Sequence, residues 1–117
     1  MASPAPRRFH RILDRALAEQ YDFMSNAERG IEPKRPLSPR EMDRWHGVSV
    51  MATPQSARKR MQVSPWLGSF VAVIEIPRDA RVRIAQTTRD LDHFTIWADA
   101  HDLLSWVVAI LRLDELE

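Results

Sequence analysis

The segment Ser69-Phe-Val-Ala-Val-Ile-Glu-Ile76 decides the fold of this chain, because it is the most strongly β-forming stretch in it. Successive side chains of an extended strand point to opposite faces. One face carries Phe70, Ala72, Ile74 and Ile76, and the other carries Val71, Val73 and Glu75. Because both faces are largely apolar, the pattern predicts a central strand that is covered on both sides.

Toward the C-terminus the sequence predicts more strands and one short helix. Pro77–Ala80 turns the chain, and Arg81–Ala85 is expected to be a half-exposed partner of the central strand, with Val82 and Ile84 pointing inward. The further elements are strands over His93–Trp97 and Trp106–Leu113, and a helical turn that Asp99 caps and that runs through Leu104.

Toward the N-terminus two helices are marked by their first residues. Ser38-Pro39-Arg40-Glu41 is a capping box with proline at the first helical position, and this helix is expected to end near His46, with Gly47 left-handed. Thr53-Pro54 starts the second helix in the same way, and Pro65 and Gly68 follow its end. Between the two helices, Val48–Met51 alternates and predicts a short strand.

The first third of the chain is less regular. Phe9–Leu13 is expected to be a strand, and Asp14 is expected to cap a short helix over Arg15–Gln20. Tyr21–Pro36 has little periodicity and predicts a long loop. Residues 1–7 predict a disordered tail and residues 114–117 an acidic tail, which leaves a single domain over residues 8–113. Because helices cluster early and strands late, the fold class is α+β rather than a doubly wound parallel sheet.

Composition excludes several classes of protein. The 117 residues suffice for one core, and 17 basic against 16 acidic residues give no general attraction to nucleic acid or membranes. The chain has no cysteine, which removes thiolate chemistry and disulfides. Without a secretory leader or a long apolar run, a cytoplasmic location is expected. Three glycines cannot form a phosphate loop, and the four histidines lack metal-ligand spacing, so no metal is expected.

Two segments carry the candidate site. The loop Tyr21–Gly30 mixes aromatic, carboxylate, hydroxyl, amide and guanidinium groups, and this mix suits a small-molecule pocket. The alternative is a helical turn in which Asp22, Ser25 and Asn26 bond local backbone. The strand His93–Trp97 places His93, Thr95 and Trp97 on one face, which we interpret as a cleft wall in preference to a solvated face. The basic run Ala57–Arg60 is interpreted as a solvated helix face, and nucleic-acid binding is not expected.

The arrangement resembles the ADP-ribosyltransferase-like fold in its compact toxin-like and RNA-phosphotransferase-like variants. The resemblance rests on polar His10 and Arg11 in the first strand, on Gly47-Val-Ser-Val-Met-Ala-Thr-Pro-Gln-Ser-Ala-Arg58 before a helix, and on a late strand with polar residues. It implies small split sheets of mixed or antiparallel strands, flanked by short helices, with NAD bound in the cleft between them.

The resemblance also implies roles for individual residues. His10 or Arg11 would hold the dinucleotide, and Ser49 or Thr53 would border the nicotinamide. The catalytic position falls in the segment with His93, Thr95 and Asp99, where the strand carries no glutamate. The residues expected to bind the cofactor are His10, Arg11, Tyr21, Phe23, Ser25, Asn26, Ser49, Thr53 and Trp97, of which the aromatic ones would stack on a flat ring.

A second hypothesis is an interaction module without catalysis. Tryptophan is frequent at the centre of protein interfaces, and an exposed Trp45, Trp66 or Trp97 would anchor a protein partner.

Overall fold

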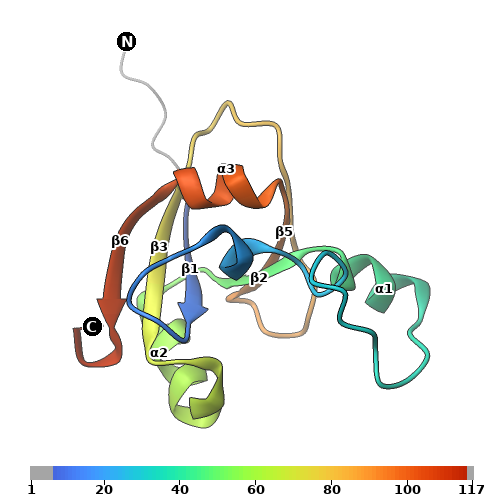
Figure 1. Cartoon of the computed structure of the whole chain (residues 1–117), viewed down its shortest axis with the longest axis horizontal. Coiled ribbons are helices and arrows are strands. Elements are labelled where there is room, and N and C mark those ends of the chain that lie inside the picture. Colours follow the sequence, from blue (N-terminus) through green and yellow to red (C-terminus); the bar gives the residue numbers. More distant parts are fainter. Residues whose placement is uncertain (1–6, 116–117) are drawn as a thin grey trace.

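The computed structural model describes residues 7–115 and shows an α+β fold (Figure 1). The strands are β1 (Arg7–Leu13), β2 (Val48–Met51), β3 (Phe70–Ile76), β4 (Arg83–Gln86), β5 (His93–Trp97) and β6 (Val107–Arg112). The α-helices are α1 (Pro39–Trp45), α2 (Pro54–Val63) and α3 (Ala100–Ser105), and the 3₁₀ turns are η1 (Gln20–Phe23), η2 (Pro65–Leu67) and η3 (Leu113–Glu115).

The strands form one antiparallel sheet in the order β4-β5-β2-β1-β3-β6. β3 lies inside the sheet between β1 and β6, as its two apolar faces predicted. The expectation of two separate small sheets is wrong, because β1 and β2 pair and join the two halves. That joint is a single residue pair, His10 with Met51, whereas β1 pairs with β3 at every residue from Arg7 to Leu13.

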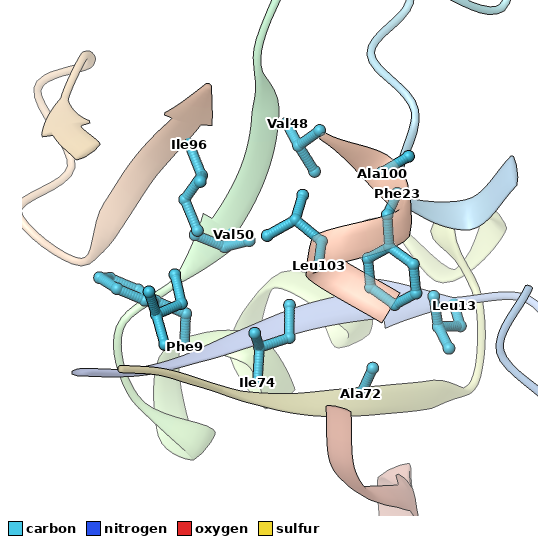
Figure 2. Close-up of a cluster of buried hydrophobic side chains, with 11 residues drawn as sticks. Phe9, Leu13, Phe23, Val48, Val50, Ala72, Ile74, Ile96, Ala100 and Leu103 are labelled. Carbon is cyan, nitrogen blue, oxygen red and sulfur yellow. The ribbon is translucent and has the colours of Figure 1, made fainter. Parts of the chain in front are cut away.

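The main core lies on the face of the sheet that α3 and η1 cover. Figure 2 shows Leu103 of α3 and Phe23 of η1 among the strand side chains Val50, Ile74 and Leu13. A smaller cluster holds α2 against the sheet, with Ala57 and Met61 beside Met51 and Val71. Each of these clusters removes apolar surface from water, which is the main favourable term in folding.

The two predicted capping boxes are confirmed. The Ser38 hydroxyl accepts from the Glu41 amide at 3.2 Å, and the Thr53 hydroxyl accepts from the Ser56 amide at 3.0 Å. Gly47 does not take a left-handed conformation. It is glycine for a different reason, because a Cβ atom there would overlap the Thr95 side chain.

Two element predictions are wrong. Residues 14–17 bend instead of forming a helix, and the first helical turn is η1. At its start the Asp22 carboxylate accepts from the backbone amide of Glu19, so this amide is not available to a helix over residues 15–20. β4 does not pair with β3: it pairs with β5 at the other end of the sheet, because β6 and β1 already occupy both edges of β3. Arg7 belongs to β1 rather than to the predicted tail, and residues 1–6 and 116–117 lie outside the described residues.

Candidate functional site

A cleft opens where β1 and β2 separate. Beyond the pair of His10 with Met51, the C-terminal part of β1 leaves β2, and a cavity of about 500 Å³ lies against both strands and the loop after β1. This volume falls within the roughly 300–1,000 Å³ of small-molecule sites. The residues that line this cleft are His10, Arg11, Ile12, Leu13, Asp14, Arg15, Tyr21, Asp22, Asn26, Arg29, Ser49, Val50, Met51, Arg60, Leu67 and His93.

Arg11 spans the opening between the two strands. Its Nη1 donates to the backbone carbonyl of Ser49 at 2.8 Å, and its Nε donates to the backbone carbonyl of Asp22 at 3.2 Å. Burial and then repulsion by Arg29 lower the pKa of Arg11 to about 10, against a smaller opposite effect of Asp22. The guanidinium therefore stays charged at neutral pH while its hydrogen bonds go to uncharged carbonyls. A partly buried cation in this state favours an anionic ligand.

Two more arginines reach the cleft from distant elements. Arg29, in the turn after η1, donates from Nε and Nη2 to the Tyr21 carbonyl, and its guanidinium carbon lies 4.5 Å from the centre of the Tyr21 ring. Arg60 comes from α2. Within residues 7–115, neither Arg29 nor Arg60 forms an ion pair with a carboxylate.

The cleft carries net positive charge. Arg15 is the fourth arginine of the wall, and it pairs with Glu19 at 3.2 Å and with Asp22 at 3.4 Å. Asp22 is also held locally, because its other oxygen accepts from the Glu19 amide at 2.7 Å. Asp14 and Asp22 are the carboxylates on a wall with four guanidiniums, so arginines outnumber them two to one.

Two histidines add neutral polar groups to the cleft. His10 is 3% exposed, and its Nδ1 lies 3.2 Å from the Met51 carbonyl. Burial lowers the pKa of His10 below 6.5. The hydrogen bond to Met51 opposes this shift, and the charge of Arg8 adds to it. Burial and then repulsion by Arg60 likewise lower the pKa of His93, whose Nδ1 lies 3.3 Å from the Thr88 hydroxyl. Both imidazoles are therefore neutral at pH 7.

A side pocket of about 280 Å³ adjoins the cleft and shares Arg11, Asn26, Ser49 and His93 with it. Thr95 and Ser25 also line it, and both are almost fully buried. The Thr95 hydroxyl lies 2.6 Å from the Thr87 hydroxyl, and the Ser25 hydroxyl accepts from the Glu28 amide at 3.1 Å. Arg11 therefore lines both the cleft and the side pocket.

The structure brings eight of the twelve predicted site residues to these two cavities: His10, Arg11, Tyr21, Ser25, Asn26, Ser49, His93 and Thr95. The loop after β1 combines features of the two interpretations from the sequence, a pocket wall and a turn with local hydrogen bonds. Asp22 and Ser25 bond local backbone, as a turn requires, and the same loop forms one wall of the cleft.

The two other aromatic residues cannot stack on a ligand in this cavity. Phe23 is completely buried in the main core, where Figure 2 shows it beside Leu13. Trp97 lines neither the cleft nor the side pocket. Its ring is covered by Arg83, with 3.8 Å between the guanidinium carbon and the ring centre, and its indole N–H donates to the Asp43 carbonyl at 2.9 Å.

Thr53 and Asp99 also lie outside both cavities, and each serves as a helix cap. The Thr53 hydroxyl holds the start of α2 through the Ser56 amide. The Asp99 carboxylate accepts from the His101 amide at 2.8 Å at the start of α3. Asp99 therefore lies apart from the other candidates for the catalytic position, His93 and Thr95.

Sequence reasoning missed Arg15 and Arg60, whereas the guanidinium of Arg29 was already part of the candidate loop Tyr21–Gly30. Arg15 lies in a bend and Arg60 in a helix far along the chain, so no local motif joins them to Arg11. One signal was present, because no aspartate or glutamate occurs between Asp43 and Glu75, the stretch that contains Arg60.

Comparisons with known proteins assign no function to this chain. No family model, curated protein or solved structure matches this chain. Within residues 7–115, no group of three or more histidine or carboxylate side chains is placed to hold a metal ion. In the same residues, no helix has the length and apolar character to cross a membrane.

Proposed function

We propose that this protein is a small ADP-ribosyltransferase-like enzyme that binds NAD in the cleft between β1 and β2. The observation that carries the proposal is the positively charged cleft around Arg11, with four arginines against two carboxylates. A dinucleotide carries its negative charge on a pyrophosphate, and arginine pairs with phosphate oxygens through two parallel N–H donors.

Other features of the cleft support the same ligand. Tyr21 is 52% exposed at the cleft and offers a ring face or edge to a flat base. Neutral His10 and His93 supply polar contacts without charge. Loss of nicotinamide from NAD develops positive charge on the ribose, which a carboxylate stabilises. In this proposal Asp14 or Asp22, on the cleft wall, takes the part first assigned to Asp99.

Thermal unfolding with NAD, combined with measurement of released nicotinamide, tests the proposal. A ligand that binds only the folded state stabilises it, by about 2.7 kcal/mol at a hundred times the dissociation constant. We expect NAD to raise the melting temperature of the wild-type chain and to release nicotinamide. Arg11→Met is expected to reduce both effects strongly, whereas Arg40→Met, on exposed α1, retains them.

Two results would contradict parts of the proposal. Stabilisation by NAD without nicotinamide release would contradict the transferase activity and support a protein that only binds NAD. Absence of both effects at millimolar NAD would remove the proposal as a whole.

A further inference from the structure

The most exposed aromatic side chain lies beside the cleft rather than in it. Trp66 in η2 is 79% exposed, and its neighbours Val63 and Leu67 are 69% and 37% exposed. Together with Lys59 on the exposed side of α2, these residues are here called the Trp66 patch. The other tryptophans considered as anchors are engaged: the indole of Trp45 donates to the Ile31 carbonyl at 2.9 Å, and the ring of Trp97 is covered by Arg83.

Backbone hydrogen bonds and close packing hold the turn that carries the patch. The Leu67 amide donates to the Ser64 carbonyl at 3.0 Å, and the Gly68 amide donates to the Pro65 carbonyl at 3.2 Å. Gly68 has a φ of 139° and packs so closely on the Leu13 backbone that a Cβ atom would overlap it. A surface that is already ordered loses less conformational freedom when it binds a partner.

The helix beside the patch is basic, although Asp14 lies close to Gly68 at the edge of the cleft. α2 carries Arg58, Lys59 and Arg60 in succession, and the whole stretch between Asp43 and Glu75 contains no acidic residue. Leu67 and Arg60 also line the cleft, so the patch continues to its edge. α2 lies at the end of the sheet away from α3 (Figure 1). An apolar centre with basic surroundings is complementary to an apolar side chain flanked by carboxylates.

We propose that the Trp66 patch docks an acidic peptide segment of a partner protein, with one apolar side chain of that segment packed on Trp66. Tryptophan and arginine dominate the strongest contacts of protein interfaces. A strand of nucleic acid fits less well, because such sites stack successive bases on several aromatic side chains and the patch has one. A second copy of this chain fits less well too, because two basic α2 helices would face each other. The docking does not depend on what the cleft binds.

Selection from a displayed library of random linear peptides tests this inference with the full chain as bait. We expect the selected peptides to share an aromatic or aliphatic residue flanked by Asp or Glu. Their binding is expected to weaken with salt and to shift the fluorescence of Trp66. Trp66→Ala is expected to weaken binding about tenfold or more, as loss of a central interface tryptophan does.

Matched variants separate the patch from general effects. Lys59→Glu is expected to weaken binding several-fold, whereas Lys34→Glu, the other lysine of the chain, is not. Val108→Ala removes an exposed apolar side chain on β6 and is expected to have no effect. Each variant is first shown to melt like the wild type, which is expected because the altered side chains are exposed.

Several outcomes would overturn the inference. These are selected peptides without net negative charge, selected peptides that bind Trp66→Ala as well as the wild type, or no enriched sequence at all. A Trp66-dependent affinity for single-stranded RNA or for phosphatidylserine vesicles, without peptide binding, would assign the patch to another class of partner. A Trp66-dependent dimer in sedimentation would assign it to a second copy of the chain.

Discussion

The two sides of β1 differ sharply. On one side β1 pairs with β3 at every residue from Arg7 to Leu13, and β3 is buried along most of its length. On the other side β1 pairs with β2 only at His10, and the side chain of Arg11 crosses the gap to the Ser49 carbonyl. One edge of this strand therefore builds the core, and the other leaves polar groups free to meet a ligand.

The largest effect on stability is expected on the side of β1 that pairs with β3. Ile74 on β3 is completely buried opposite Phe9, so Ile74→Ala leaves a cavity in the main core. Large-to-small changes of this kind cost about 2–5 kcal/mol in the free energy of unfolding. Denaturant unfolding measures it, and a loss below about 1 kcal/mol would show that this side is not the stabilising one.

A substitution on the side of β1 that faces β2 is expected to change ligand binding rather than stability. Arg11→Met removes two hydrogen bonds to carbonyls but also a partly buried charge, so the net change in unfolding free energy is expected to be within about 1 kcal/mol. Binding of NAD is expected to weaken by about ten- to a hundredfold, since a hydrogen bond to a charged group contributes about 1.5–3 kcal/mol. Calorimetric titration measures the second effect. Unchanged NAD affinity in a folded Arg11→Met chain would show that Arg11 does not contribute to NAD binding.

A smaller effect on stability is expected where α1 meets β5. Gly47→Ala places a methyl group against Thr95 and Trp97, and overpacking of this kind costs about 1–3 kcal/mol. Because Thr95 lines the side pocket, the same variant should also change ligand affinity. Gly30→Ala is the control, because no atom lies within 4 Å of a Cβ there, although its φ of 75° adds some backbone strain. Equal ligand affinity in the two variants would argue against a role for the side pocket.

The smallest effect is the dependence on pH. The pKa values of His10 and His93 are lowered in the folded chain, so near pH 6.5 the unfolded chain binds protons that the folded chain does not. Their contribution to stability is therefore fully present above pH 6.5 and decreases as the pH falls below it. Melting temperatures measured at several pH values around and below 6.5 give the dependence of stability on pH. The double variant His10→Gln, His93→Gln is expected to show a weaker dependence. The same dependence in the double variant would contradict the assignment.

The sequence predicts what is local in this molecule. The capping boxes at Ser38 and Thr53 depend on residues three positions apart, and the alternation of β3 and β5 is visible within each strand. The partner of β4 was not predictable in this way, because the links on either side of β4, residues 77–82 and residues 87–92, are equally long and either could close a hairpin. The choice depends on β6, which returns to the free edge of β3.

The same distinction applies to the site. Arg11 and Ser49 were candidates through the resemblance to the ADP-ribosyltransferase-like fold, and in the structure the Arg11 guanidinium donates to the Ser49 carbonyl. Arg60 could not be added, because only the packing of α2 brings it to the cleft. For Asp99 the capping pattern in the sequence was the better guide, since a carboxylate that accepts from the His101 amide is held at the start of α3 and away from the cleft.

We propose that the opening between β1 and β2 holds the ligand. Amide chemical shifts of the labelled chain, recorded by NMR during titration with NAD, test it most directly. We expect saturable shifts at His10–Arg15, at Tyr21–Arg29 and at Ser49–Met51, with no shifts in β6 or in the part of β3 that pairs with it. Saturable shifts centred on β3 and β6, or no shifts at millimolar NAD, would contradict it.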